Sequence, residues 1–178
     1  EAIASLRAAG HRVLFVTNNS YAKVAQQEAT LNLIGIPAVG DVLTSSGAAA
    51  TLLKPGQRIL VAGGPGVVEA VESVGAIVAG RTDDDSSPLE QAESDSDIDA
   101  VIVGFHRTFN FDSMRRASAA VRAGATLIGT NDDATYPTSS GVIPGGGSIL
   151  AAIATASGVD PIIAGKPYAP MGEWSDEY

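Results

Sequence analysis

Short apolar runs alternate with helical patterns along the whole chain. The run Val13–Val16 is apolar and mostly β-branched or aromatic, which is typical of a short strand buried on both faces. Further strands are predicted at 42–44, 58–62, 76–79, 100–104, 125–129 and 162–163. Helices are predicted at 1–10, 21–33, 45–53, 67–74, 111–123 and 148–156. Strands and helices that alternate at this spacing predict an α/β fold with parallel sheets.

The first predicted strand ends in a polar tetrapeptide. Val13–Val16 is followed by Thr17, Asn18, Asn19 and Ser20, and then by a helical pattern. Ligands of open α/β sheets bind at the carboxyl ends of strands, and a helix amino end offers unpaired N–H groups to an anion. We therefore expect a phosphate site here. The alternative is an ordinary helix cap with Asn19 or Ser20 at the N-cap position.

A single lysine follows the last predicted strand. Gly165 and Pro167 flank Lys166 and restrict its backbone just beyond that strand. A lysine held in this way can neutralise both a nucleophile and a phosphate, which stabilises the charge that develops during phosphoryl transfer. The alternative is a lysine in a surface turn.

The motif GGPG at 63–66 lies between a predicted strand and a predicted helix. The arrangement is similar to a dinucleotide fingerprint, but the spacing is not GxGxxG and no lysine with a following Ser or Thr is present. A tight turn is the simpler interpretation. The motif still leaves a second function open, a non-catalytic module that binds a nucleotide or free phosphate.

Two polar or glycine-rich connections could face one cleft. TNDD at 130–133 ends a predicted strand and offers Asn131 and Asp133, while PGGGS at 144–148 begins a predicted helix. Glycine lets the backbone approach a ligand closely, so Gly145 and Gly147 are candidate binding positions. His106 follows the strand at 100–104 and could face the same cleft. The alternative for both connections is a flexible loop.

Composition narrows the class of protein. The chain has 178 residues, 45% of them hydrophobic, a net charge of −9 and no cysteine. The 11 Lys and Arg are scattered, which argues against nucleic acid as a partner. No apolar run approaches the roughly 20 residues of a membrane span, and we expect a cytoplasmic protein. The acidic segment 83–99 is interpreted as a solvated loop, because it lacks the spacing of a calcium loop.

The ordered set of motifs resembles a known family. VLFVTNNS, VIVGFHRTFNFDSMRRA, LIGTNDDATYP, GVIPGGGSILAAIATASG and AGKPYAPM are similar to segments of the haloacid dehalogenase-like phosphatases. The resemblance is to the subfamily with a large α/β cap, which includes nitrophenylphosphatase-like enzymes, pyridoxal phosphate phosphatase and glycerol phosphatases. It covers residues 1–171. It implies an incomplete doubly wound, Rossmann-like core sheet from 1–54 and 144–178, with an inserted α/β cap at 55–143.

The resemblance also implies roles for the candidate core residues. Thr17 matches the second-motif hydroxyl that binds the transferring phosphoryl group, and Asn18 beside it would help to hold the substrate phosphate. Asn19 is kept as a third phosphate-binding candidate of the same motif. Lys166 matches the third-motif lysine that steadies the nucleophile and the phosphate.

The cap candidates match the family in part. Asn131 and Asp133 match its TNxD loop, and Gly145 and Gly147 match its PGxG turn. His106 departs from the pattern, because members often carry an aspartate there, and this difference bears on substrate choice.

Two catalytic motifs of the family have no counterpart in this chain. The nucleophile is the first aspartate of a DxDG motif on a strand before residue 1, and a Gly-Asp strand end that binds magnesium should follow Lys166. The resemblance therefore implies a Mg²⁺-dependent phosphatase that forms an aspartyl-phosphate in a longer parent protein. Its substrate would be a small glycerol phosphate- or sugar phosphate-like ester. We expect this chain to be an inactive fragment without metal ligands of its own, and a homodimer through the cap is a further expectation.

Overall fold

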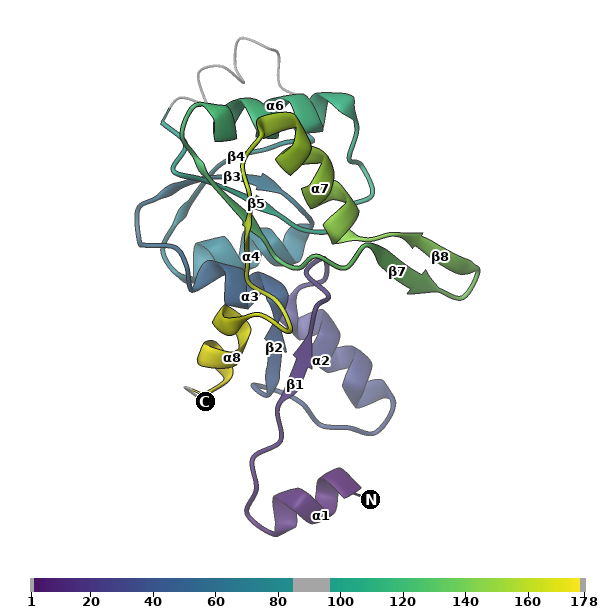
Figure 1. Ribbon diagram of the computed structural model, residues 1–178. Helices are drawn as coiled ribbons and strands as arrows, with labels where there is room; N and C mark the ends of the chain where they lie inside the picture. The colour runs from purple at the N-terminus through teal and green to yellow at the C-terminus, as the bar shows by residue number, and fades with distance from the viewer. Residues whose placement is uncertain (1, 85–96, 177–178) are drawn as a thin grey trace.

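The computed structural model describes residues 2–84 and 97–176, so most of the acidic segment predicted as a loop lies outside the described residues. The largest element is a five-stranded parallel sheet with the strand order β4-β3-β5-β6-β9 (Figure 1). Its strands are β3 (Arg58–Ala62), β4 (Ile77–Arg81), β5 (Ala100–Val103), β6 (Thr126–Gly129) and β9 (Ile162–Ile163). The predicted α/β class with parallel strands is confirmed.

Helices cover both faces of this sheet. The helices α3 (Ser45–Ala50) and α4 (Pro65–Ser73) pack on one face, and α6 (Phe111–Arg122) and α7 (Gly146–Ser157) pack on the other. Successive side chains of a strand point to opposite faces. Ile59 and Val61 therefore join the core under α3 and α4, whereas Leu60 and Ala62 join the core under α6 and α7. Burial on both sides explains why these strands are apolar at nearly every position.

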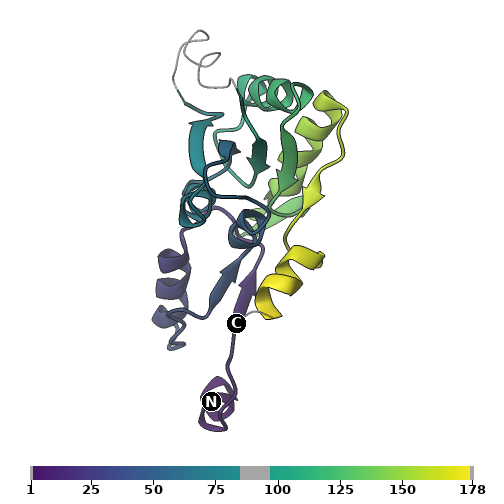
Figure 2. The same ribbon diagram turned by 90° about the vertical axis from the view of Figure 1, so that its left-hand side faces the viewer.

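A second, smaller sheet lies beside the first. It consists of β1 (Phe15–Thr17) and β2 (Val42–Thr44), which are parallel, with α2 (Val24–Leu33) between them in the chain. All three residues of β1 are only half-buried, so the prediction of a strand buried on both faces was wrong. In the described residues β1 pairs with β2 alone, which leaves its other edge open. The helix α1 (Ala2–Ala8) stands away from both sheets (Figures 1 and 2).

Two elements were not predicted from the sequence. The hairpin of β7 (Thr135–Thr138) and β8 (Gly141–Pro144) projects from the body of the molecule (Figure 1). The segment was read as loop, although β-branched and aromatic residues before a two-residue turn are a hairpin signal. The helix α8 (Ala169–Asp176) was also missed, and Pro170 in its first turn was the signal for it.

Strand pairing places residues 146–163 with the larger sheet. β9 pairs with β6, and α7 packs against α6 and β6. The division expected from the sequence had put residues after 143 with the core that contains β1. The expected boundary lay at the PGxG turn, 144–147, but the chain after this turn still packs on the larger sheet until β9. In the described part of the chain, no helix is both long and apolar enough to cross a membrane.

Candidate functional site

A hollow of about 320 Å³ lies where the carboxyl ends of strands from both sheets meet. The end of β1, the connection after β6, the hairpin and the amino end of α7 form its wall. The lining residues are Thr17, Asn18, Asn19, Ser20, Phe105, Asn131, Asp133, Thr135, Tyr136, Pro137, Gly145 and Gly146. Six of the predicted site residues, from three separate segments of the chain, are therefore brought together.

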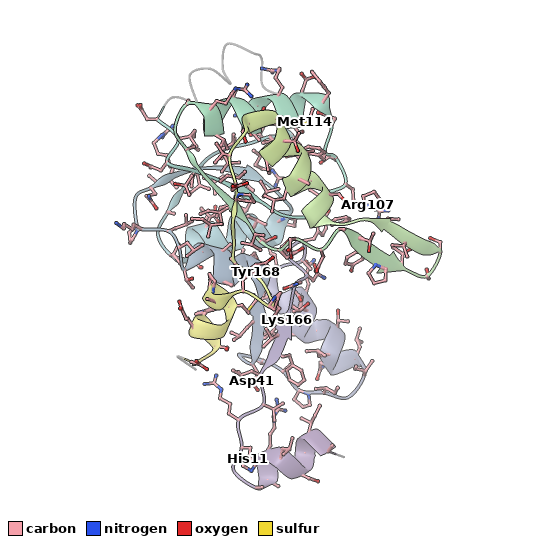
Figure 3. The ribbon with its side chains drawn as sticks, in the orientation of Figure 1. His11, Asp41, Arg107, Met114, Lys166 and Tyr168 are labelled. Carbon is pink, nitrogen blue, oxygen red and sulfur yellow. The ribbon has the colours of Figure 1, made fainter. Side chains whose placement is uncertain are left out.

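Lys166 reaches the same end of β1 from the segment after β9. Its ammonium group donates a hydrogen bond to the Val16 carbonyl at 2.9 Å, although 150 residues separate the two. Val16 directly precedes Thr17, so the hydroxyl and the ammonium group that the sequence singled out lie at one strand end. The Lys166 side chain is exposed and lies between β1 and α8 (Figure 3).

The turn after β1 organises the Thr17 hydroxyl. The Thr17 Oγ1 accepts a hydrogen bond from the Asn19 N–H at 3.1 Å. A hydroxyl that accepts in this way still carries a hydrogen that it can donate to a phosphate oxygen. The Asn19 Oδ1 in turn accepts from the Tyr21 N–H at 3.1 Å, so this side chain stabilises the turn.

The helix expected directly after this turn begins later. It was predicted from residue 21 but starts at Val24, with Lys23 at the N-cap, so neither Asn19 nor Ser20 caps it. The Val24 N–H donates to the Glu69 carboxylate at 2.9 Å. A carboxylate of α4 therefore already occupies the α2 amino end, and the helix whose first residues line the hollow is α7.

The TNDD connection contacts the end of β1 through two side chains. The Asn131 Nδ2 donates to the Asn18 carbonyl at 2.8 Å, and the Asp133 Oδ2 accepts from the Asn18 Nδ2 at 3.1 Å. Inside the connection, the Asp133 N–H donates to the Asn131 Oδ1 at 3.1 Å. Both predicted side chains thus lie at the hollow.

The glycines of PGGGS allow two connections to pack against each other. A Cβ at Gly145 would lie 2.3 Å from the Asp133 carbonyl oxygen, and one at Gly147 would lie 2.3 Å from the Asp132 carbonyl. The Gly145 and Gly147 N–H groups donate to the carbonyls of Ala134 and Asp133, both at 2.9 Å. These two N–H groups hold the TNDD connection, and Gly147 does not line the hollow.

Two aromatic side chains that were not predicted as site residues, Phe105 and Tyr136, also line the hollow. The Phe105 ring stacks on Tyr136 of the hairpin with a centroid separation of 5.4 Å and an interplanar angle of 19°. Tyr21 meets Phe105 edge-on at 6.0 Å. Tyr136 was missed because the hairpin was missed. Phe105 directly follows a predicted strand end, and this was the available signal.

His106 lies away from the hollow, contrary to the expectation that it faces the cleft. It is 4% exposed, and its Nδ1 lies 3.3 Å from the hydroxyl of Thr108, which donates to Asp83 at 2.7 Å. Burial lowers the pKa of His106, and Arg81 lowers it further, while Asp83 opposes them. Neighbouring residues alternate in direction at the end of β5, so Phe105 faces the hollow and His106 faces the β4 end.

The GGPG turn packs against the segment after β1. The Gly66 N–H donates to the Tyr21 carbonyl at 2.8 Å, and a Cβ at Gly64 would lie 2.4 Å from the Tyr21 ring. These contacts fit the simpler interpretation of a tight turn. They leave the Gly66 N–H unavailable to a nucleotide phosphate.

Comparison with known proteins assigns the family. A model described as haloacid dehalogenase-like hydrolase matches residues 1–77. The D-glycerol 3-phosphate phosphatase of Mycobacterium tuberculosis is 38% identical over 171 residues, which are 93% of this chain and 45% of that protein. The crystal structure of a hypothetical protein from Pyrococcus horikoshii superposes with a TM-score of 0.87 and 34% identity, over 99% of this chain and 67% of that one. The chain belongs to the haloacid dehalogenase-like hydrolases.

A further haloacid dehalogenase-like structure carries a metal. The glycerol phosphate phosphatase from Mycobacterium tuberculosis was crystallised with magnesium and superposes with a TM-score of 0.82 and 35% identity, over 99% of this chain and 51% of that one. The chain spans about half the length of the curated relatives it matches.

The described residues do not fit a magnesium site. Residues 2–84 and 97–176 contain no group of three or more His, Asp or Glu side chains that could hold a metal ion. The carboxylate that lines the hollow, Asp133, accepts a hydrogen bond from Asn18, and the adjacent Asp132 accepts one from the Tyr168 hydroxyl. That hydrogen bond raises the pKa of Tyr168. Magnesium prefers several fixed oxygen ligands, and this haloacid dehalogenase-like chain does not supply them here.

Proposed function

We propose that this chain forms the phosphate-binding edge and the covering α/β domain of a phosphatase that acts on small organic phosphate monoesters. The observation that carries the proposal is the hydrogen bond from the Lys166 ammonium group to the Val16 carbonyl, beside Thr17 and the hollow. Thr17 and Lys166 would bind the transferring phosphoryl group. Glycerol phosphate- and sugar phosphate-like esters are the substrate class that we favour.

We assign separate roles to the residues that line the hollow and to Lys166 beside it. The Thr17 hydroxyl would donate to a phosphoryl oxygen, and the Lys166 ammonium group would neutralise the charge that develops there. Asn131 would hold the TNDD connection against the end of β1, next to the bound phosphoryl group. The organic part of the ester would lie toward Phe105 and Tyr136, where the wall is aromatic.

The remaining catalytic parts would come from a longer protein. By family resemblance, an aspartate nucleophile would attack phosphorus and release the alcohol, and water would then cleave the acyl phosphate and restore the carboxylate. We place its strand at the open edge of β1, which makes β1 and β2 part of a doubly wound core and the five-stranded sheet part of the cap. Magnesium and its carboxylate ligands belong to the same proposal, because the described residues do not provide them.

Phosphate release tests the proposal directly. A longer protein that contains this chain should release phosphate from glycerol 3-phosphate, sugar phosphates and p-nitrophenyl phosphate when magnesium is present, and the 178-residue chain alone should not. Phosphatase activity of the 178-residue chain would contradict the expectation that this chain lacks the nucleophile. A folded longer protein that hydrolyses none of these esters would contradict the assigned reaction.

Substitution of the two converging residues sharpens this test. In the longer protein, Thr17→Val and Lys166→Ala should each lower kcat about 10²–10³-fold, the usual cost of losing one group that stabilises the transition state. Lys54→Ala is the control, because Lys54 is exposed and does not line the hollow. An equal loss in Lys54→Ala and Lys166→Ala would show that positive charge in general, and not the position of Lys166, matters.

We also propose that the cap forms a homodimer. Gel filtration with light scattering checks this expectation, and a monomer at all protein concentrations would contradict it.

A further inference from the structure

Asn18 is the residue on which four segments of the chain meet. We infer that Asn18 is a positioning residue: its side chain holds the Lys166 backbone and links it to Asp133, and it does not contact the phosphate. The catalytic meaning of this inference rests on the proposed function, but the contacts that carry it do not.

The donor capacity of the Asn18 side chain is fully used. Its Oδ1 accepts from the Lys166 N–H at 2.9 Å, and its Nδ2 donates to the Lys166 carbonyl at 3.1 Å. The same Nδ2 donates to the Asp133 Oδ2 at 3.1 Å. A carboxamide nitrogen carries two hydrogens, so none is left for a phosphate oxygen. The sequence-based expectation that this side chain helps to hold phosphate is replaced by a different role.

The main chain of Asn18 is held from two further directions. Its carbonyl accepts from the Asn131 Nδ2 at 2.8 Å and from the Ser45 hydroxyl at 2.9 Å. A carbonyl oxygen has two lone pairs, so this acceptor is also saturated. Contacts from the β2–α3 junction and from the connection after β6 therefore fix the amide that recognises Lys166.

Gly165 makes this recognition possible. A Cβ at position 165 would lie 2.7 Å from the Asn18 Oδ1 and 2.4 Å from the Thr130 carbonyl oxygen. Only glycine lets the Lys166 backbone come close enough to bond the Asn18 amide on both its N–H and its carbonyl. With the backbone held there, the side chain extends back to the Val16 carbonyl.

The shared nitrogen couples two parts of the site. Lys166 and Asp133 lie on separate segments after β9 and β6, yet both accept from the single Asn18 Nδ2. Movement of the TNDD connection would change the hydrogen bonding of the group that positions the lysine. Asn18 thus transmits the position of the connection after β6 to the ammonium group.

The reactivity of the lysine amines tests the inference in the 178-residue chain itself. The chain has three lysines, Lys23, Lys54 and Lys166. Limited acetylation with acetic anhydride, read by mass spectrometry, reports each amine separately. In Asn18→Ala the acetylation rate of Lys166 should rise about fivefold, the change expected when one ordinary hydrogen bond is lost. Lys23 and Lys54 should react as in the wild type.

Two further variants separate positioning from general loosening. Asn19→Ala is the matched neighbour, because the Asn19 side chain bonds the Tyr21 N–H and not Lys166, and it should leave the Lys166 acetylation rate unchanged. Asp133→Ala should raise that rate by about twofold, since one of two acceptors on the shared nitrogen is lost. In the Asn18→Ala background, Asp133→Ala should add nothing.

The same measurement can overturn the inference. An unchanged Lys166 rate in Asn18→Ala would show that the amide does not position the lysine. Equal increases at all three lysines would show that Asn18 is a general structural residue. Neither result depends on catalysis, so a failure of the phosphatase assay and a failure of this inference are distinguishable.

Discussion

The two sheets of this molecule are built from similar apolar strands but differ in burial. All four residues of β5 are buried, whereas all three residues of β1 are half-buried. β5 has a strand on each side and helices on both faces, while β1 pairs with β2 alone within the described residues. A groove of about 710 Å³ runs along β1 and α2 and is lined by Leu14, Phe15 and Val16 among others. An apolar run thus indicates that a strand can be buried, but the strands and helices that pack around it decide whether it is.

The candidate chemistry lies where the two sheets meet. Asn18 follows β1, Asn131 follows β6 and Lys166 follows β9, and hydrogen bonds link all three. The well-packed sheet supplies a rigid wall, and the small sheet supplies the strand end that carries Thr17. Catalytic groups are best held by rigid elements, so the stability of the larger sheet should matter for the geometry at the end of the smaller one.

The largest difference between the sheets should appear in core truncations. Leu60 in β3 is fully buried, so Leu60→Ala should lower the free energy of unfolding by about 2–5 kcal/mol. Leu14, just before β1, is only partly buried, and Leu14→Ala should cost less, about 1–2 kcal/mol, since part of its surface already contacts water. Urea unfolding followed by circular dichroism measures both. Equal losses would mean that the small sheet is as well packed as the large one.

A single added methyl group where the TNDD connection packs against the start of α7 should lower the free energy of unfolding. Gly147→Ala would place a Cβ 2.3 Å from the Asp132 backbone, so the TNDD connection must shift, at a cost of about 1–3 kcal/mol in unfolding free energy. Gly172 in α8 has no atom within 4 Å of such a Cβ. Gly172→Ala should therefore stabilise the chain by up to about 1 kcal/mol through helix propensity. The melting temperature should fall in Gly147→Ala and rise in Gly172→Ala. A change in the same direction in both variants would contradict the close contact between Gly147 and Asp132.

The smallest effect concerns pH and belongs to the larger sheet. Burial lowers the pKa of His106, so the unfolded chain binds a proton more readily than the folded chain. The contribution of the neutral ring to stability is complete above about pH 6.5 and is lost as the pH falls from there toward the folded pKa, at no more than about 1.4 kcal/mol per pH unit.

Urea unfolding at pH 7.5 and pH 5.5 measures this dependence. The difference between the two pH values should shrink in His106→Gln. It should persist in His11→Gln, because His11 is exposed. Identical pH dependence in the wild type and His106→Gln would show that the buried histidine contributes nothing to it.

Particular residues show how far prediction from sequence reached. Asn110 directly precedes the helix predicted from residue 111, and its side chain accepts from the Ser113 N–H as an N-cap residue does. Thr17, Asn18 and Asn131 were found because polar side chains at strand ends are unusual after apolar runs. His106 was misplaced because a residue next to a strand end can turn to either side, and local pattern does not choose between them.

The amino-acid sequence by itself determined the alternation of strands and helices, the parallel α/β class, the family, and which strand ends are polar. These follow from local periodicity and from motifs read in order. Only the tertiary structure decided that residues 146–163 join the larger sheet, that β1 pairs with β2 alone within the described residues, and that Lys166 and Asp133 take both Nδ2 hydrogens of Asn18. The Asn18 contacts join residues more than 100 positions apart, and no local pattern encodes which distant partner a hydrogen-bonding group will meet.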